Sequence, residues 1–140
     1  MVEELKKEEL NKILDILKEN NKPVWLFAFL KMDEFVDKWS LVLSAPWINE
    51  LNKSEEFKSI IDILKKNIAD DKLSSIARIV FLPKNDHLVE ELLKKTTGYE
   101  FKEEKVNGNI IHCGVIIESN TGLQWIENKN LKLDINNKRP

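Results

Sequence analysis

Arginine and glycine are scarce in this 140-residue chain, and each shortage argues against a class of function. The four glycines are too few for a loop that cradles phosphates, and no P-loop, G-x-G-x-x-G or H-E-x-x-H motif occurs. Arg78 and Arg139 are the only arginines, although arginine is the preferred side chain for contacts with phosphates and bases. Together with the net charge of −2, this composition argues against a nucleic-acid partner.

Cysteine and long apolar runs are lacking as well. Cys113 is the single cysteine, so the chain cannot form an intramolecular disulfide, and a reducing compartment is expected. No apolar run approaches the ~18 residues of a membrane span, and residues 1–20 lack the apolar core of a secretory signal. The sequence therefore predicts a cytoplasmic protein without membrane contact, and it suggests neither a cofactor nor a metal site.

The most prominent feature that is present is an aromatic and apolar block at Val24–Ile48, which contains three of the four tryptophans. Two runs within it, Val24–Leu30 and Trp39–Ala45, are apolar on both of the faces that alternate along a strand. Strands of this kind are covered on both faces and lie inside a sheet. The block therefore locates the core of the protein.

Hydrophobic spacing and turn residues predict the other elements. Apolar side chains at helical spacing predict an amphipathic helix over about residues 3–19. The patterns that follow the aromatic block predict a helix after Asn52, a short helix after Asp70 or Asp71, a strand over Arg78–Leu82, a helix from Asn85 or Asp86 to about Lys95, and strands over Tyr99–Val106 and Asn109–Glu118. Asn52 and Glu55 resemble a capping box. Asn107-Gly108 is a strong signal for a two-residue hairpin turn.

This order of elements predicts an α/β or α+β fold with one mixed sheet of about five strands, antiparallel hairpins at both ends and helices packed on its faces. A parallel crossover through helices is expected between the hairpins. Residues 1–135 are expected to form one domain, followed by a polar tail over residues 136–140. Eight apolar strand residues are expected to share a single core: Leu26, Phe27, Leu41, Leu43, Ile79, Phe81, Ile111 and Val115.

Three residues suit the chemistry of a metal-dependent nuclease of the PD-(D/E)xK type, which needs carboxylates to hold Mg²⁺ and a lysine to assist the attacking water. Glu100 and Lys102 lie on the same face of a predicted strand, and Asp86 lies upstream. The chain contains five E-x-K triplets, so this pair also arises from composition alone. Asp86 is equally well explained as a helix cap.

His112 and Cys113 are a second candidate pair, because histidine can activate a cysteine nucleophile. Neighbours on a strand point to opposite faces, so the two cannot pair with each other, and His87 would have to approach Cys113 instead. A free cysteine in an apolar strand is usually a small buried hydrophobe. Cys113 is therefore expected to be buried, and His112 remains a candidate for binding.

Four further residues are candidates for ligand binding. Ser44 is placed at the end of a central strand, where α/β folds position their sites. Trp39 and Trp47 could form the wall of a pocket. Arg78 could anchor an anionic ligand or pair with a nearby carboxylate.

The lack of a catalytic constellation favours a non-catalytic protein-interaction module, such as an accessory, inhibitor or immunity-type subunit. A homodimer formed through a sheet edge or through the first helix is one form of this hypothesis. A metal-dependent nuclease or small hydrolase is the second hypothesis, and a small-molecule binding module is the third. Convergence of the candidate side chains in one cleft would favour an enzyme.

Overall fold

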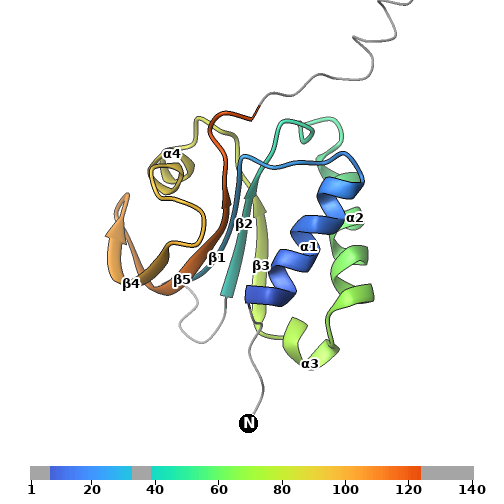
Figure 1. Ribbon diagram of the computed structural model, residues 1–140, viewed down its shortest axis with the longest axis horizontal. Helices are drawn as coiled ribbons and strands as arrows, with labels where there is room; N and C mark the ends of the chain where they lie inside the picture. The colour runs from blue at the N-terminus through green and yellow to red at the C-terminus, as the bar shows by residue number, and fades with distance from the viewer. Residues whose placement is uncertain (1–6, 33–38, 124–140) are drawn as a thin grey trace, which may run out of the picture.

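The computed structural model describes residues 7–32 and 39–123 and contains one mixed sheet with helices on both faces (Figure 1). Its elements are α1 (Lys7–Glu19), β1 (Leu26–Met32), β2 (Trp39–Ser44), α2 (Lys53–Asn67), α3 (Asp70–Leu73), β3 (Ile76–Phe81), α4 (His87–Leu93), β4 (Glu100–Val106) and β5 (Asn109–Ser119). The five strands lie in the order β3-β2-β1-β5-β4. The predicted fold class is confirmed in its α+β form, and the predicted tail lies outside the described residues.

Strand β1 lies at the centre of the sheet and runs antiparallel to both of its neighbours, β2 and β5. Strand β3 runs parallel to β2, and α2 and α3 lie in the connection between them, which confirms the expected crossover. The β1–β2 pair is antiparallel, as predicted, but β3 adds outside β2, so this pair lies in the interior of the sheet. Residues 33–38, which join β1 to β2, lie outside the described part.

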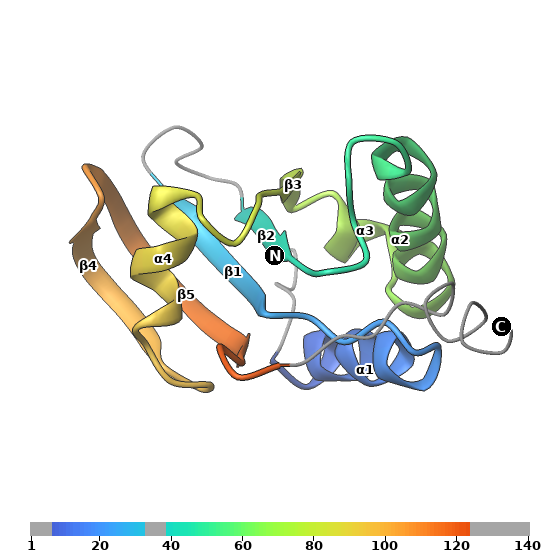
Figure 2. The same cartoon turned by 90° about the horizontal axis from the view of Figure 1, so that it is seen from above.

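The sheet separates two apolar cores, which corrects the prediction of a single one. On one face, Phe27, Leu41 and Leu43 pack with the inner sides of α1 and α2. On the other face, Leu26 and Ile111 pack with α4. Figure 2 shows α1 and α2 on one side of the sheet and α4 on the other. Neighbouring residues of a strand point to opposite faces, so the eight predicted core residues are divided between the α1/α2 face and the α4 face.

Local signals predicted some helix ends correctly and others wrongly. Asp86 caps α4, since its Oδ1 accepts hydrogen bonds from the backbone N–H groups of Leu88 (2.9 Å) and Val89 (3.3 Å). Asn52 precedes α2 but makes no side-chain capping bond, so the predicted capping box with Glu55 is wrong. The short helix α3 likewise begins after Ala69 rather than after a capping aspartate.

The predicted hairpin between β4 and β5 is confirmed. Asn107 and Gly108 both have positive φ angles, 48° and 80°, as a type I′ turn requires. Gly98, which follows α4, also has a positive φ of 91°, and its N–H donates to the carbonyl of Ile116 in β5.

A charged network joins this hairpin to the end of α4. Glu104 accepts a hydrogen bond from the Tyr99 hydroxyl (2.6 Å) and lies 2.8 Å from Lys95 Nζ. Hydrogen bonding from Lys95, and then from Tyr99, lowers the pKa of Glu104 below 4.5. The bond to Glu104 in turn raises the pKa of Lys95 above 10.5.

These pKa directions predict a pH dependence of stability. A lowered carboxylate pKa in the folded state adds stability above the unfolded pKa, and this contribution is lost as the pH falls through 4.5 and below. Glu104→Gln is therefore expected to lose less stability than the native protein between about pH 6 and pH 3 in urea denaturation. Glu100→Gln, on the same strand with a side chain that is 75% exposed, is the control and should behave like the native protein. Parallel acid profiles of native protein and Glu104→Gln would contradict the prediction.

Among the described residues, no helix has the length and apolar character needed to cross a membrane.

Candidate functional site

The two edges of the sheet differ sharply in chemistry. In β4, five of the seven residues are charged, and Glu103 has a positive φ of 46° that interrupts the regular strand. Charges and irregular backbone are the usual devices that keep an edge strand from pairing with another chain. In β3, with the sequence IARIVF, only Arg78 is charged. The β4 edge is therefore protected against strand addition, whereas β3 has only one charged side chain.

The backbone of β3 has hydrogen-bonding groups on its open side. Leu82 N–H, just after the strand, donates to the carbonyl of Leu43 in β2. Peptide groups alternate in direction along a strand, so those of Val80 also face β2, while those of Ile79 and Phe81 face away from it. No described strand lies beyond β3, so these outward groups are positioned to pair with an added strand.

An apolar groove of about 250 Å³ lies between β3 and α2, and we call it the β3 groove. Its lining residues are Phe57, Ile61, Leu64, Lys65, Leu73, Ile76, Ala77, Arg78 and Ile79. Phe57 of α2 is 40% exposed. Its ring meets that of Phe81 edge to face, with centroids 5.9 Å apart. The groove thus borders the open strand with apolar side chains.

A second hollow of about 370 Å³ lies where β2 and β3 end, and we call it the Trp25 pocket. Its lining residues are Trp25, Ala45, Pro46, Ile48, Asn49, Glu50, Lys53, Phe81, Leu82, Pro83 and Lys84. Phe81 lines this pocket and contacts Phe57 in the β3 groove, so the two hollows adjoin. Together they follow the β3 edge from its beginning to its end.

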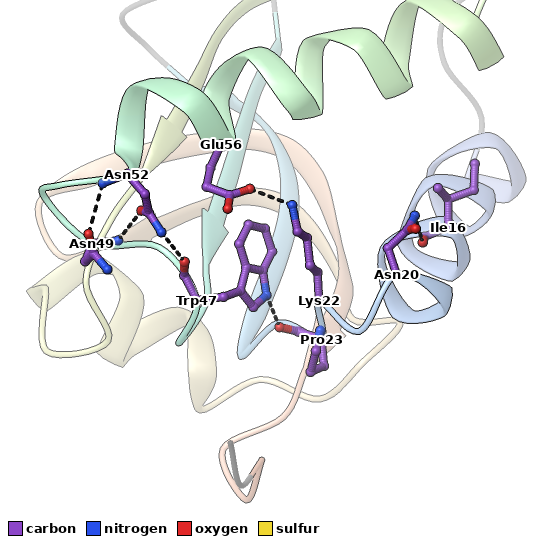
Figure 3. A network of polar contacts seen from close by, with 8 residues as sticks. All are labelled: Ile16, Asn20, Lys22, Pro23, Trp47, Asn49, Asn52 and Glu56. Atoms are coloured by element: carbon purple, nitrogen blue, oxygen red, sulfur yellow. Dashed lines mark hydrogen bonds and ion pairs between the residues drawn. The ribbon is translucent and has the colours of Figure 1, made fainter. Parts of the chain in front are cut away.

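The loop between β2 and α2 is held in place by a hydrogen-bond network (Figure 3). Asn49 Oδ1 accepts from the N–H groups of Leu51 (2.8 Å) and Asn52 (3.0 Å), and Asn52 Oδ1 accepts from Asn49 N–H (2.8 Å). Asn52 Nδ2 donates to the carbonyl of Trp47 (2.9 Å). These bonds explain why Asn52 does not cap α2, and they fix a loop that forms one wall of the Trp25 pocket.

Trp47 anchors this loop in the core. Its indole is 7% exposed, and its Nε1 donates to the carbonyl of Pro23 (2.6 Å). Lys22 Nζ lies 5.3 Å from the centre of the indole ring and 2.7 Å from Glu56 Oε1. Trp47 was predicted to form the wall of a pocket. It anchors the loop between β2 and α2 but does not line the Trp25 pocket.

The structure separates the three residues of the nuclease hypothesis. Glu100 reaches toward Lys7 of α1 (3.7 Å), and Lys102, two residues along the same strand, shares its side of the sheet. Asp86 caps α4, which covers the opposite face. Within residues 7–32 and 39–123, no group of three or more His, Cys, Asp or Glu side chains is arranged to hold a metal ion.

Ser44, His112 and Arg78 are also dispersed. Ser44 pairs with Leu26 at one end of β1, whereas His112 lies near the other end, beside the Met32–Ile111 pair. His112 Nδ1 is 3.0 Å from Glu103 Oε1 across the hairpin. Arg78 Nε donates to Ser40 Oγ (3.1 Å). The described geometry therefore does not bring these candidates into one cleft.

Trp39 and Cys113 occupy the α1/α2 face of the sheet. Trp39 stacks on Phe29 with ring centroids 4.4 Å apart and planes 5° apart. Cys113 is only partly buried, which corrects the prediction of a fully buried thiol: it packs at the margin of this core and lines a shallow hollow with Trp39. His87 lies in α4 on the opposite face, so it does not approach Cys113.

The sequence did not single out Trp25 or the β3 edge. Comparison with known protein families, with curated proteins and with solved structures finds no match for this chain. The geometry of the β3 edge and its two hollows is therefore the basis of the functional argument.

Proposed function

We propose that the protein is a non-catalytic cytoplasmic interaction module that binds an extended apolar segment of another protein along β3. The observation that carries the proposal is the contrast between the two sheet edges: β4 is charged and irregular, whereas β3 is apolar, regular over Arg78–Phe81 and bordered by a groove. An added strand would pair with the outward peptide groups of Ile79 and Phe81. An accessory, inhibitor or immunity-type role is compatible with this mode of binding.

The side chains around the groove indicate the chemistry of the partner. Apolar residues at alternate positions of the bound segment would contact Phe57, Ile61 and Ile76. Lys65 lines the groove, and Arg78, whose Nε donates to Ser40 Oγ on the α4 face of the sheet, places a second cation on the same edge strand. A segment with apolar alternation and acidic residues at its flanks therefore fits best, because opposite charges favour encounter and register.

The test uses a charge placed on the edge itself. Ala77 is exposed on β3 and lines the groove, so Ala77→Lys should block strand addition without disturbing either core. Asn11→Lys, on the exposed side of α1, adds the same charge elsewhere. In affinity purification from the native host, a partner should be retained by the native protein and by Asn11→Lys and lost from Ala77→Lys. With that partner, Phe57→Ala should raise the Kd about tenfold.

Two outcomes would contradict the proposal. Equal retention of the partner by Ala77→Lys and Asn11→Lys would place binding away from β3. By light scattering we expect the mass of the 16.4 kDa monomer. A stable dimer that is lost in Ala77→Lys would instead mean that a second copy of the chain occupies the β3 edge.

A further inference from the structure

We propose that the Trp25 pocket is a separate binding site for a small molecule that combines an apolar ring with one carboxylate. This site is independent of strand addition at β3, because it needs no partner protein. Its volume, about 370 Å³, falls within the range of small-ligand pockets. It also lies beyond the carboxyl ends of the parallel strands β2 and β3, where α/β sheets commonly bind ligands.

The walls of the pocket are fixed before any ligand binds. Trp25 is held at both of its backbone groups: its N–H donates to the carbonyl of Ser44 (2.9 Å), and its carbonyl accepts from Asn120 N–H (2.8 Å). The loop that carries Glu50 and leads into α2 at Lys53 is held by the Asn49–Asn52 bonds (Figure 3). The third wall is formed by the segment after β3, where the Asp86 N–H donates a hydrogen bond to the carbonyl of Pro83 (3.1 Å). A preformed pocket loses little conformational entropy on binding.

The lining indicates the chemistry of the ligand. Trp25, Pro46 and Phe81 provide apolar surface for a ring. The charged lining residues are Lys53, Lys84 and Glu50, which leaves an excess of one positive charge and favours a single carboxylate. Lys84 Nζ lies 5.1 Å from the centre of the Trp25 ring, so a ring bound at the indole would hold its carboxylate within reach of this cation.

Trp25 also carries an unpaired donor. Trp25 Nε1 is shielded from water and has no hydrogen-bond acceptor among the described residues. A buried donor without a partner lowers stability, and the signal of this N–H reports on the wall of the pocket. The other indoles in the described part are already engaged, Trp47 by Pro23 and Trp39 by stacking on Phe29.

The experiment follows the Trp25 indole N–H in ¹H–¹⁵N NMR spectra, assigned with Trp25→Phe, during titration with 3-phenylpropionate. We expect a saturable shift of this signal, with a Kd of the order of 1 mM for so small a probe. The neutral analogue 3-phenylpropionamide and the variant Lys84→Gln should each weaken binding about tenfold. Lys66→Gln removes the same charge from the far end of α2 and should bind as the native protein does.

Absence of a saturable shift at Trp25 would overturn the inference, as would equal binding of the amide or unchanged binding by Lys84→Gln. Saturable binding that shifts Trp39 or Trp47 but not Trp25 would also overturn it. Ala77→Lys should retain probe binding, since Ala77 does not line this pocket. The same variant therefore separates failure at this site from failure of strand addition at β3.

Discussion

Phe27→Ala is expected to lower the free energy of unfolding by about 3–5 kcal/mol. Phe27 is fully buried at the centre of the sheet, where it pairs with Leu43 of β2 on one side and with Glu118 of β5 on the other. Its ring belongs to the core beneath α1 and α2. Removing it leaves a cavity that fixed neighbouring strands cannot close, and urea denaturation followed by circular dichroism measures the loss.

Phe57→Ala is the matched control, because it makes the same chemical change at a side chain that is 40% exposed. We expect a loss below about 1 kcal/mol at this position. Similar losses of unfolding free energy for Phe27→Ala and Phe57→Ala would contradict the assignment of Phe27 to the centre of the core.

Gly114→Ala is expected to lower the free energy of unfolding by about 2–3 kcal/mol. A Cβ at this position would lie 2.7 Å from the carbonyl oxygen of Phe29 and 2.8 Å from Leu30 Cδ2. The carbonyl belongs to β1, which is held on both sides by other strands and cannot move away. The same denaturation measurement checks this value.

Gly122→Ala provides the comparison for Gly114→Ala. Its added Cβ would meet only Asn120 Oδ1, at 4.0 Å, so the change in stability should be below about 0.5 kcal/mol. If Gly114→Ala were as stable as Gly122→Ala, the close pairing of β1 and β5 would be contradicted.

Much of the fold follows from local pattern. Apart from Lys31, Ser40 and Ser44, the runs that became β1 and β2 are apolar on both faces because both faces of the sheet are covered, and the structure bears this out. The turn at Asn107-Gly108 and the cap at Asp86 depend on neighbouring residues alone, and both were predicted correctly. The pattern says that a strand is buried but not which helix covers each face, so the division into two cores was missed.

Asn52 shows where local pattern fails. Its spacing from Glu55 suits a capping box, yet its side chain bonds Asn49 and the carbonyl of Trp47 instead. The Trp47 residue that accepts one of these bonds is itself anchored, since its Nε1 donates to the carbonyl of Pro23. A competing tertiary contact of this kind leaves no trace in the four-residue motif.

The candidate site depended on strand order, which sequence alone did not provide. The apolar run at Arg78–Leu82 has the composition of an interior strand, but β3 lies at the edge because no described strand pairs beyond it. The Trp25 pocket is assembled from three separate stretches of chain, before β1, after β2 and after β3. Trp25 was one of several tryptophans in the aromatic block, and only its position beside Pro46 and Lys84 distinguishes it.

Backbone amide exchange along β3, measured by NMR on the free protein and on its complex with the partner, tests the proposed docking edge most directly. In the free protein, Val80 and Leu82 should exchange slowly because their N–H groups face β2, whereas Ile79 and Phe81 should exchange quickly. In the complex, Ile79 and Phe81 should become slow, while the amides of β4 at the opposite edge keep their rates. Unchanged exchange of Ile79 and Phe81 in the complex would contradict binding by strand addition at β3.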